Sequence, residues 1–192
     1  MAIHSLKFPE ELTLNIGCGS DISGDVRVDI TLASKGANLL CNLENGIPFK
    51  GDSFKKVIAY GIIEHSTNPG FLVSEMFRVL KSNGLLELIT DNAAFPLIYL
   101  PHQRHAGGYK GNNNEDRHYM VFHPSHLSVL LKKYGFSSIA ITVGKYISID
   151  GSPTGTATKT LQSIGLLMSR MGMSMSICQY FLPIITIVAK KP

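Results

Sequence analysis

Leu12–Ile30 reads LTLNIGCGSDISGDVRVDI, and the rest of the chain is organised around this stretch. Its first five residues form a short apolar run that favours a buried strand, and Gly17-Cys18-Gly19 ends that run abruptly. Glycines lack the Cβ atom and permit positive φ, so a small ligand could lie against this turn. Residues 26–30 alternate between apolar and polar, which predicts a second short strand with Asp29 near its carboxyl end. In an open α/β sheet, a carboxylate at that position can accept hydrogen bonds from both hydroxyls of a ribose.

The segments LNIGCG (residues 14–19) and VDI (residues 28–30) resemble motifs I and II of the class I S-adenosylmethionine-dependent methyltransferases. The resemblance implies that S-adenosylmethionine is the cofactor and that Asp29 binds its ribose. The two motifs are close together, which leaves little room for a full helix after the first strand. The cofactor-binding residues that the resemblance and the predicted strand ends indicate are Asn15, Gly17, Cys18, Gly19, Asp29, Asn42, Leu43, Tyr60 and Gly61.

Two alternatives to this interpretation stay open at this point. A nicotinamide-binding G-x-G-x-x-G turn would need a third glycine where Ile22 stands, and it would place the ribose acid ~20 residues after the turn rather than at Asp29. Nicotinamide binding is therefore disfavoured. The other alternative is a glycine turn in an ordinary α/β domain. For Asn42 in particular, capping of its own turn competes with binding of an adenine edge.

A second resemblance supports the first. Residues 47–66, IPFKGDSFKKVIAYGIIEHS, are similar to motif IV and its flanks in the small-molecule branch of the same superfamily, although Lys55 stands where that branch usually has an acid. His65 follows the predicted fourth strand, so it is the first candidate for a general base or for orienting the acceptor, because an imidazole titrates near neutral pH. A structural role for the Glu64-His65 pair, tying the next helix to the cofactor loop, is the alternative. His118 and Tyr119 are the second catalytic candidates.

The resemblance covers residues 12–149 and implies the fold class. We expect a Rossmann-like α/β fold with a seven-stranded, mostly parallel sheet, an antiparallel last strand and three α/β/α layers. The length of 192 residues favours a single methyltransferase domain over residues 1–192. Residues 150–182 are expected to be an insertion before the last strand, which we place at residues 184–189.

Residues 91–120 are the least regular part of the sequence, and we interpret them as a lid or substrate loop over the cofactor face. Histidines are frequent in and just after this stretch, and the pattern H-x-x-H occurs twice. This pattern makes a zinc site one interpretation, but the cluster contains no cysteine, and a long polar loop collects histidines readily. No metal is therefore expected. The histidines concerned are His102, His105, His118, His123 and His126.

Composition limits the partners and the compartment. The formal charge is +4, but the 18 Lys and Arg residues are spread along the chain, which indicates a solvated surface rather than a nucleic-acid track. The three cysteines form no C-x-x-C pair and predict reduced thiols. Residues 1–11 contain no apolar segment typical of a signal peptide, so a cytoplasmic location is the simplest expectation.

The C-terminal region contains four methionines, at positions 168, 171, 173 and 175, which form a soft apolar surface. Packing in the core is the first expectation. A homodimer contact, the wall of an apolar substrate pocket and binding to a membrane surface are the alternatives. No transmembrane segment is expected, because Arg170, Gln179 and Pro183 interrupt the apolar run.

The sequence thus favours transfer of a methyl group to an oxygen or nitrogen nucleophile of an acceptor, by default a small molecule. The chain has no Asn-Pro-Pro-Tyr after the predicted fourth strand, so DNA is not expected as the acceptor, while RNA or protein stays open. A nicotinamide-dependent reductase would need a catalytic Tyr-x-x-x-Lys on a helix, which the sequence does not offer. The alternative outside enzymes is a non-catalytic partner subunit with a cofactor-binding fold.

Overall fold

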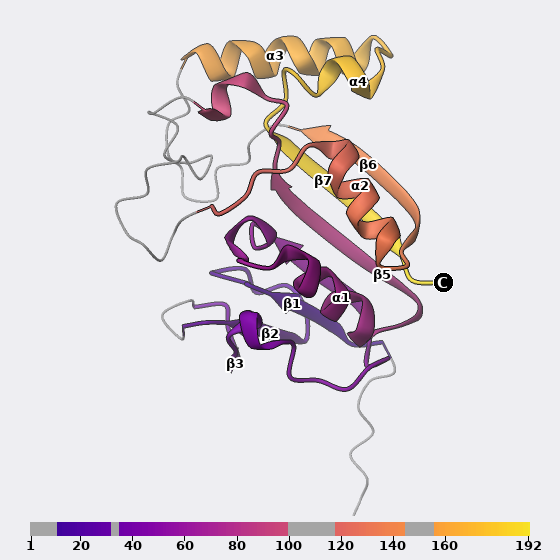
Figure 1. The fold of residues 1–192 in the computed structure, drawn as a ribbon. Helices are drawn as coiled ribbons and strands as arrows, with labels where there is room; N and C mark the ends of the chain where they lie inside the picture. Colours follow the sequence, from indigo (N-terminus) through magenta and orange to yellow (C-terminus); the bar gives the residue numbers. More distant parts are fainter. Residues whose placement is uncertain (1–10, 32–34, 100–117, 145–155) are drawn as a thin grey trace, which may run out of the picture.

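The computed structural model describes residues 11–31, 35–99, 118–144 and 156–192 (Figure 1). Seven strands form one sheet in the order β3-β2-β1-β4-β5-β7-β6, in which β7 runs antiparallel to both neighbours and the other adjacent strands pair in parallel. This confirms the predicted sheet and its antiparallel last strand. The strands are β1 (Thr13–Ile16), β2 (Val26–Asp29), β3 (Leu39–Leu40), β4 (Phe54–Tyr60), β5 (Leu80–Asp91), β6 (Ser137–Gly144) and β7 (Ile184–Lys190).

Two helices, α1 (Pro69–Val79) and α2 (Pro124–Lys133), pack side by side on one face of the sheet (Figure 1). Each begins with a proline, whose missing N–H costs nothing in the first turn. Each also has a side-chain cap, because Asn68 accepts a hydrogen bond from the Phe71 N–H and His123 accepts one from the Ser125 N–H. Their apolar sides, with those of β1, β4, β5 and β7, form the main core.

The connection between β1 and β2 contains turns and no helix, as the short spacing of the two motifs predicts. Hydrogen bonds close this compact loop. Asp25 Oδ2 accepts from the Thr13 N–H at 2.8 Å, and the Asp25 N–H donates to the Thr13 carbonyl at 3.0 Å. The Arg27 side chain donates to the carbonyls of Gly24 and Gly36. The loop is therefore held in shape without the usual helix.

Strand β5 is longer than the sequence indicates. Ser82-Asn83-Gly84 is a turn-forming sequence, which predicts a strand only from Leu85, but β5 continues directly from the end of α1 at Leu80, which pairs with Phe54. The turn residues lie within β5, and Asn83 takes a positive φ of 64° there. Only the first part of β5 is irregular, and its carboxyl end is a regular strand that leads into the candidate site.

The segment between β6 and β7 contains α3 (Thr156–Arg170) and α4 (Met175–Cys178). Both lie at the same end of the molecule as the carboxyl end of β5 (Figure 1). Three short 3-10 helices complete the described elements: η1 (Leu43–Asn45), η2 (Ile63–His65) and η3 (Pro96–Tyr99). Within the described ranges, none of the helices is long and apolar enough to cross a membrane.

Candidate functional site

The glycine turn after β1 has the backbone conformation that its sequence predicts. Gly17 and Gly19 have φ values of 61° and 53°, a region that residues with a Cβ rarely adopt. The two glycines differ, however, in what lies beside them. A Cβ on Gly17 would lie 2.5 Å from Cδ1 of Ile62, so the space that this glycine frees is filled by the protein's own side chain. A Cβ on Gly19 would meet nothing within 4 Å, so the turn is open to a ligand at Gly19.

Replacing Gly17 with alanine should therefore destabilise the fold. The left-handed backbone costs a non-glycine residue about 1–2 kcal/mol, and the overlap with Ile62 adds about 1–3 kcal/mol. We expect chemical denaturation to give a loss of about 2–4 kcal/mol for Gly17→Ala. The double variant Gly17→Ala/Ile62→Ala should be less destabilised than the sum of the two single variants. Strict additivity would show that Ile62 does not make Gly17 necessary.

Asp29 connects the glycine turn to the end of β2. It ends β2, and its Oδ2 accepts a hydrogen bond from the Gly19 N–H at 2.8 Å, while Oδ1 accepts from the Thr31 N–H at 3.3 Å. The Cys18 N–H donates to the Val28 carbonyl at 3.1 Å, which fixes the turn against β2. Because Asp29 is only half-buried, its carboxylate can accept further hydrogen bonds.

The thiol of Cys18 contributes no charge to this turn. Burial of the side chain, with the nearby carboxylate of Asp29, raises the pKa of the thiol. Cys18 therefore stays protonated at neutral pH, and what it offers a ligand is its backbone and a neutral sulfur.

Asn15 holds the loop that follows the glycine turn. Its buried side chain donates from Nδ2 to Asp21 Oδ2 at 3.1 Å and to the Ser23 carbonyl at 3.2 Å. Asn42 is exposed and caps η1, because its Oδ1 accepts from the Glu44 N–H at 3.0 Å. This is the turn-capping alternative named above. The adjacent Leu43 packs against the main core.

Tyr60 and Gly61 stand where β4 ends. Burial raises the pKa of the Tyr60 hydroxyl to about 12, with a further contribution from its hydrogen bond to Glu87. Tyr60 is therefore a neutral hydrogen-bonding group at any physiological pH. Gly61 has a φ of 61°, and its N–H donates to the Ile89 carbonyl at 2.9 Å, so β4 and β5 stay paired up to the site.

Hydrogen bonds link η1 to the residues that follow η2. Glu44 of η1 accepts from the Ser66 hydroxyl at 2.8 Å and from the Thr67 N–H at 3.1 Å, and Thr67 Oγ1 also donates to it. The sequence assigned such a tie to the Glu64-His65 pair as an alternative to catalysis. In the structure, the two residues after His65 make that connection.

Glu64 organises the other half of the site. Its side chain is 3% exposed, and its Oε2 accepts from the Thr90 hydroxyl at 2.9 Å. Its backbone carbonyl accepts from the N–H groups of Tyr119 and Met120, at 2.8 Å and 3.3 Å. These bonds bring a segment more than fifty residues away in sequence against η2, which sets His118 beside His65.

The imidazoles of His65 and His118 meet edge to face, with ring centroids 4.4 Å apart and an angle of 82° between the rings. Nδ1 of His118 lies 3.2 Å from Oδ2 of Asp91, the last residue of β5. Both side chains of this contact are largely buried. The result is a chain of groups, Asp91 to His118 to His65, across the carboxyl ends of β4 and β5.

Glu64 lies next to this chain of groups, and the pKa of its carboxyl group is near neutral pH. Burial raises its pKa from 4.5 to about 7, and the neighbouring Asp91 adds to the rise, while His118 and Thr90 oppose it. A carboxyl group of this kind can exist in either protonation state near neutral pH.

The raised pKa predicts how stability depends on pH. Because the folded-state pKa lies above the usual 4.5, the favourable contribution of Glu64 is complete below pH 4.5 and is lost as the pH rises through 7. Above pH 7 the buried charge should cost about 3 kcal/mol. We therefore expect Glu64→Gln to be more stable than wild type at pH 8 and to lose little stability between pH 5 and pH 8, as measured by urea denaturation.

A matched control is Glu44→Gln. Burial alone would raise the pKa of Glu44, but the hydrogen bonds from Thr67 and Ser66 outweigh it and hold the pKa below its usual value. This shift has the opposite sign, so its contribution changes only at acidic pH. Parallel stability curves for wild type and Glu64→Gln between pH 5 and pH 8 would contradict the assignment to Glu64.

Three groups of the site could also hold a metal ion. Glu64, His65 and His118 each offer a ligand atom, and these atoms lie within 4.8 Å of one another. The histidine pattern considered in the sequence is distributed differently. His123 caps α2, and His126 lies beside it with ring centroids 5.6 Å apart, while His102 and His105 lie outside the described residues.

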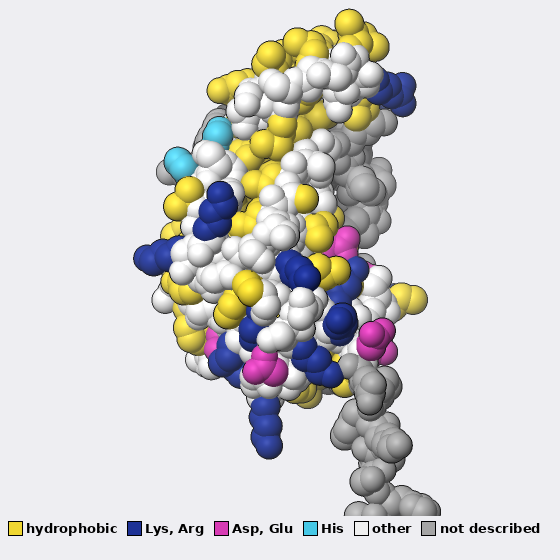
Figure 2. Space-filling view, turned by 90° about the vertical axis from the view of Figure 1, so that its right-hand side faces the viewer, with side chains coloured by type: hydrophobic (Ala, Val, Ile, Leu, Met, Phe, Trp, Pro, Cys, Tyr) yellow, Lys and Arg dark blue, Asp and Glu magenta, His cyan; other side chains and the backbone are white. Residues whose placement is uncertain are grey.

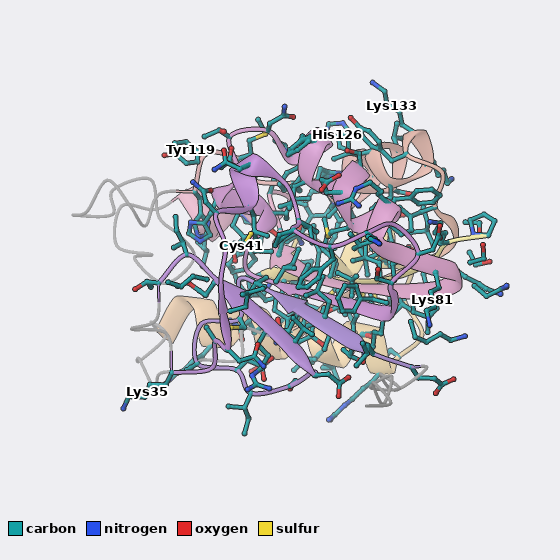
Figure 3. The ribbon with its side chains drawn as sticks, turned by 90° about the horizontal axis from the view of Figure 1, so that it is seen from below. Lys35, Cys41, Lys81, Tyr119, His126 and Lys133 are labelled. Atoms are coloured by element: carbon teal, nitrogen blue, oxygen red, sulfur yellow. The ribbon has the colours of Figure 1, made fainter. Side chains whose placement is uncertain are left out.

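The structure brings His65 and His118 together, whereas the Tyr119 side chain is not part of this ring contact. The Tyr119 side chain is 56% exposed and lies at the rim of the molecule (Figure 3). Sequence reasoning missed Asp91 and Glu64 as members of the site. Asp91 carries a recognisable signal, because it is the first acid after an apolar strand and so stands at the carboxyl end of β5. The lid expected at residues 91–120 lies outside the described residues from 100 to 117.

A separate groove of about 320 Å³ lies between the start of α2 and α4. It contains none of the candidate catalytic or cofactor-binding residues. Its lining is formed by His123, Pro124, Ser125, Ser128, Ile141, Met175, Ser176 and Gln179. Because it lies away from the glycine turn and from Asp29, we do not assign it to the cofactor.

Comparison with known protein families shows which family the chain belongs to. A family model described as a methyltransferase domain matches residues 13–141, about two thirds of the chain. The chain belongs to this methyltransferase family. The match begins at β1 and ends in β6, so it includes the glycine turn, Asp29 and the His65–His118 pair. The comparison with curated proteins gives no match.

Solved structures of S-adenosylmethionine-dependent methyltransferases have the same fold. One from Archaeoglobus fulgidus is 17% identical with a TM-score of 0.59, covering 94% of this chain and 86% of its own. Phosphoethanolamine N-methyltransferase 2 of Haemonchus contortus, in complex with S-adenosyl-L-methionine, is 17% identical with a TM-score of 0.57, covering 96% of this chain and 50% of its own. A Haloferax volcanii protein described as a putative methyltransferase, in complex with the Trm112 activator, is 13% identical with a TM-score of 0.60, covering 95% of this chain and 82% of its own.

The chain is thus a class I S-adenosylmethionine-dependent methyltransferase. The residues present fit this cofactor. The open side of Gly19 leaves room for a ligand against the backbone, and the half-buried carboxylate of Asp29 has free acceptor capacity for ribose hydroxyls. The bound cofactor would supply an activated methyl group, so the protein needs no further activation of the donor.

Proposed function

We propose that this methyltransferase transfers the methyl group to an oxygen or nitrogen nucleophile of a small molecule. We further propose that the Asp91–His118–His65 chain removes the proton from that nucleophile. The observation that carries the proposal is the 3.2 Å approach of Asp91 Oδ2 to His118 Nδ1, with the His65 ring in edge-to-face contact with His118. A methyl acceptor that is an alcohol, a phenol or an ammonium group must lose a proton, and imidazoles do this near neutral pH.

Each group of this chain has a defined task. Asp91 is proposed to orient His118 through its 3.2 Å approach to Nδ1, which would leave the opposite ring nitrogen of His118 as the base. His65 orients the acceptor or takes the proton itself. Positioning contributes as much as proton transfer, because the reacting atoms must lie in line at about 3–3.5 Å with water excluded. Tyr119, although exposed in the structure, is proposed to contact the acceptor from the segment that leads out of residues 100–117.

The cofactor is proposed to lie along the carboxyl ends of β1, β2 and β4. Gly17, Cys18 and Gly19 form the turn beneath its methionine part, and Asp29 accepts from its ribose. Asn15 acts indirectly, by holding the loop through Asp21 and Ser23. The groups proposed to complete the site around the adenine and the methyl group are Asn42, Leu43, Tyr60 and Gly61.

The test begins with binding and then turns to chemistry. Calorimetric titration with S-adenosylmethionine and its demethylated product establishes the cofactor site. A panel of amines, alcohols, sugars and phenols, scored by release of the demethylated product, then identifies the acceptor class. Cofactor binding without turnover on any acceptor would favour the alternative of a non-catalytic partner subunit. Full turnover by His65→Ala with normal cofactor affinity would remove the proposed role of His65.

The remaining expectations are proposals of the same kind. We propose one domain over residues 1–192, with residues 91–120 as a lid over the acceptor and residues 150–182 as an insertion before β7. The three cysteines are free thiols in the structure, which supports the proposal of a reducing compartment such as the cytoplasm.

A further inference from the structure

An apolar surface covers the end of the molecule formed by α3 and α4, where hydrophobic side chains gather (Figure 2). It is called the α3–α4 surface below. All of its members are more than a third exposed, and three of them are methionines. They are Ile164, Leu167, Met171, Met173, Met175, Ile177 and Tyr180.

This surface is distinct from the side on which α3 packs against the protein. Ile164, Leu167 and Met171 follow one another at spacings of three and four, so they form one stripe along α3 and just beyond its end. The opposite side of the helix contains the buried Gly165, where a Cβ would lie 2.7 Å from Cβ of Phe181. Helix α3 is therefore closely packed against the protein on that side, and the stripe is exposed although the helix is well packed.

Positive charge borders the stripe. Lys159 and Arg170 are eleven residues apart, close to three full helical turns, so both lie along one side of α3. Both are exposed. The sequence from residue 151 to residue 192 contains no Asp or Glu. An exposed apolar stripe with flanking cations is the arrangement of helices that lie in the interface of an anionic membrane.

The surface is firmly attached to the candidate active site. Asn92, which follows Asp91 directly, is fully buried, and its Nδ2 donates to the carbonyls of Gln179 and Leu182, both at 2.7 Å. Its backbone N–H donates to the Pro183 carbonyl at 2.7 Å. A partner that binds α3 and α4 therefore lies at the same edge of the sheet as Asp91 and His118.

We propose that the α3–α4 surface binds the face of an anionic lipid bilayer. Its methionine and aliphatic side chains would enter the interface, and Lys159 and Arg170 would contact lipid phosphates. A second copy of the chain fits less well. Symmetric pairing through this surface would place cations near cations, and residues 151–192 have no acid to compensate them. The proposal concerns attachment to the membrane and does not depend on the identity of the methyl acceptor.

The experiment is co-flotation of the full chain with vesicles of phosphatidylcholine alone or mixed with phosphatidylserine. We expect binding to the mixed vesicles that weakens at high salt. Leu167→Ser should lower the partition coefficient roughly tenfold, because the apolar side chain no longer enters the interface. Arg170→Gln should lower it roughly fivefold at low salt and little at high salt.

The matched control is Val129→Ser on α2, where a side chain of similar exposure lies outside the α3–α4 surface. It should bind vesicles like wild type. Retained S-adenosylmethionine binding shows that each variant is folded. No binding of wild type to the mixed vesicles would overturn the proposal. Concentration-dependent dimers that Leu167→Ser dissociates, without vesicle binding, would assign the surface to a second copy instead.

Discussion

Asp29→Ala should weaken the binding of S-adenosylmethionine by at least about 100-fold in calorimetric titration. The alanine removes the acceptor for the ribose hydroxyls and also the acceptor for the Gly19 N–H. Hydrogen bonds to a charged group contribute about 1.5–3 kcal/mol each, so the loss of two of them corresponds to this change in affinity. Asp29→Asn keeps an acceptor for Gly19 and should give a smaller loss, roughly tenfold.

Asp25→Asn is the matched control for this experiment. Asp25 also accepts a backbone N–H at 2.8 Å, from Thr13, but it lies at the amino end of β2, away from the site. Its replacement should leave the cofactor affinity unchanged. If Asp29→Ala binds the cofactor like wild type while remaining folded, Asp29 does not contact the ribose, and the proposed place of the cofactor is wrong.

The sheet could be predicted because its signals are local. The apolar runs, the glycine turn and the Asn68-Pro69 helix start each specify their own segment, and the family motifs specify how the strands are arranged. The role of Gly17 could not be predicted in this way. Its missing Cβ makes room for Ile62, and that contact joins residues far apart in sequence.

The site was predictable to a similar degree. His65 and His118 stand out as histidines, but nothing in the sequence specifies that they touch. Their contact depends on the Glu64 carbonyl, which accepts backbone N–H groups from Tyr119 and Met120. Asp91 stands between an apolar strand and an irregular segment, and the sequence pattern alone places it in the irregular segment, whereas the structure makes it the last residue of β5. The first expectation for the Met-rich region is packing in the core, whereas three of its four methionines are exposed, and these three lie beyond the end of α3, in the turn before α4 and at its start.

Replacing His118 tests the chemistry of the proposed site most directly. With the acceptor found in the screen, His118→Ala should lower kcat by about 100-fold to 10,000-fold, the range for loss of a general base. The affinity for S-adenosylmethionine should change little, because His118 lies with Asp91 and His65 rather than at the glycine turn. His126→Ala is the control, since His126 is exposed on α2 (Figure 3) and makes its ring contact with His123 rather than with the site.

The role of Asp91 follows from the same experiment. Asp91 is a positioning residue that acts through His118, so Asp91→Asn should lower kcat with little change in KM. The double variant Asp91→Asn/His118→Ala should be no slower than His118→Ala alone, because the carboxylate has nothing left to orient. If the two losses multiply instead, Asp91 acts independently of His118. If neither change affects kcat, proton transfer does not limit the reaction and positioning of the acceptor accounts for the rate.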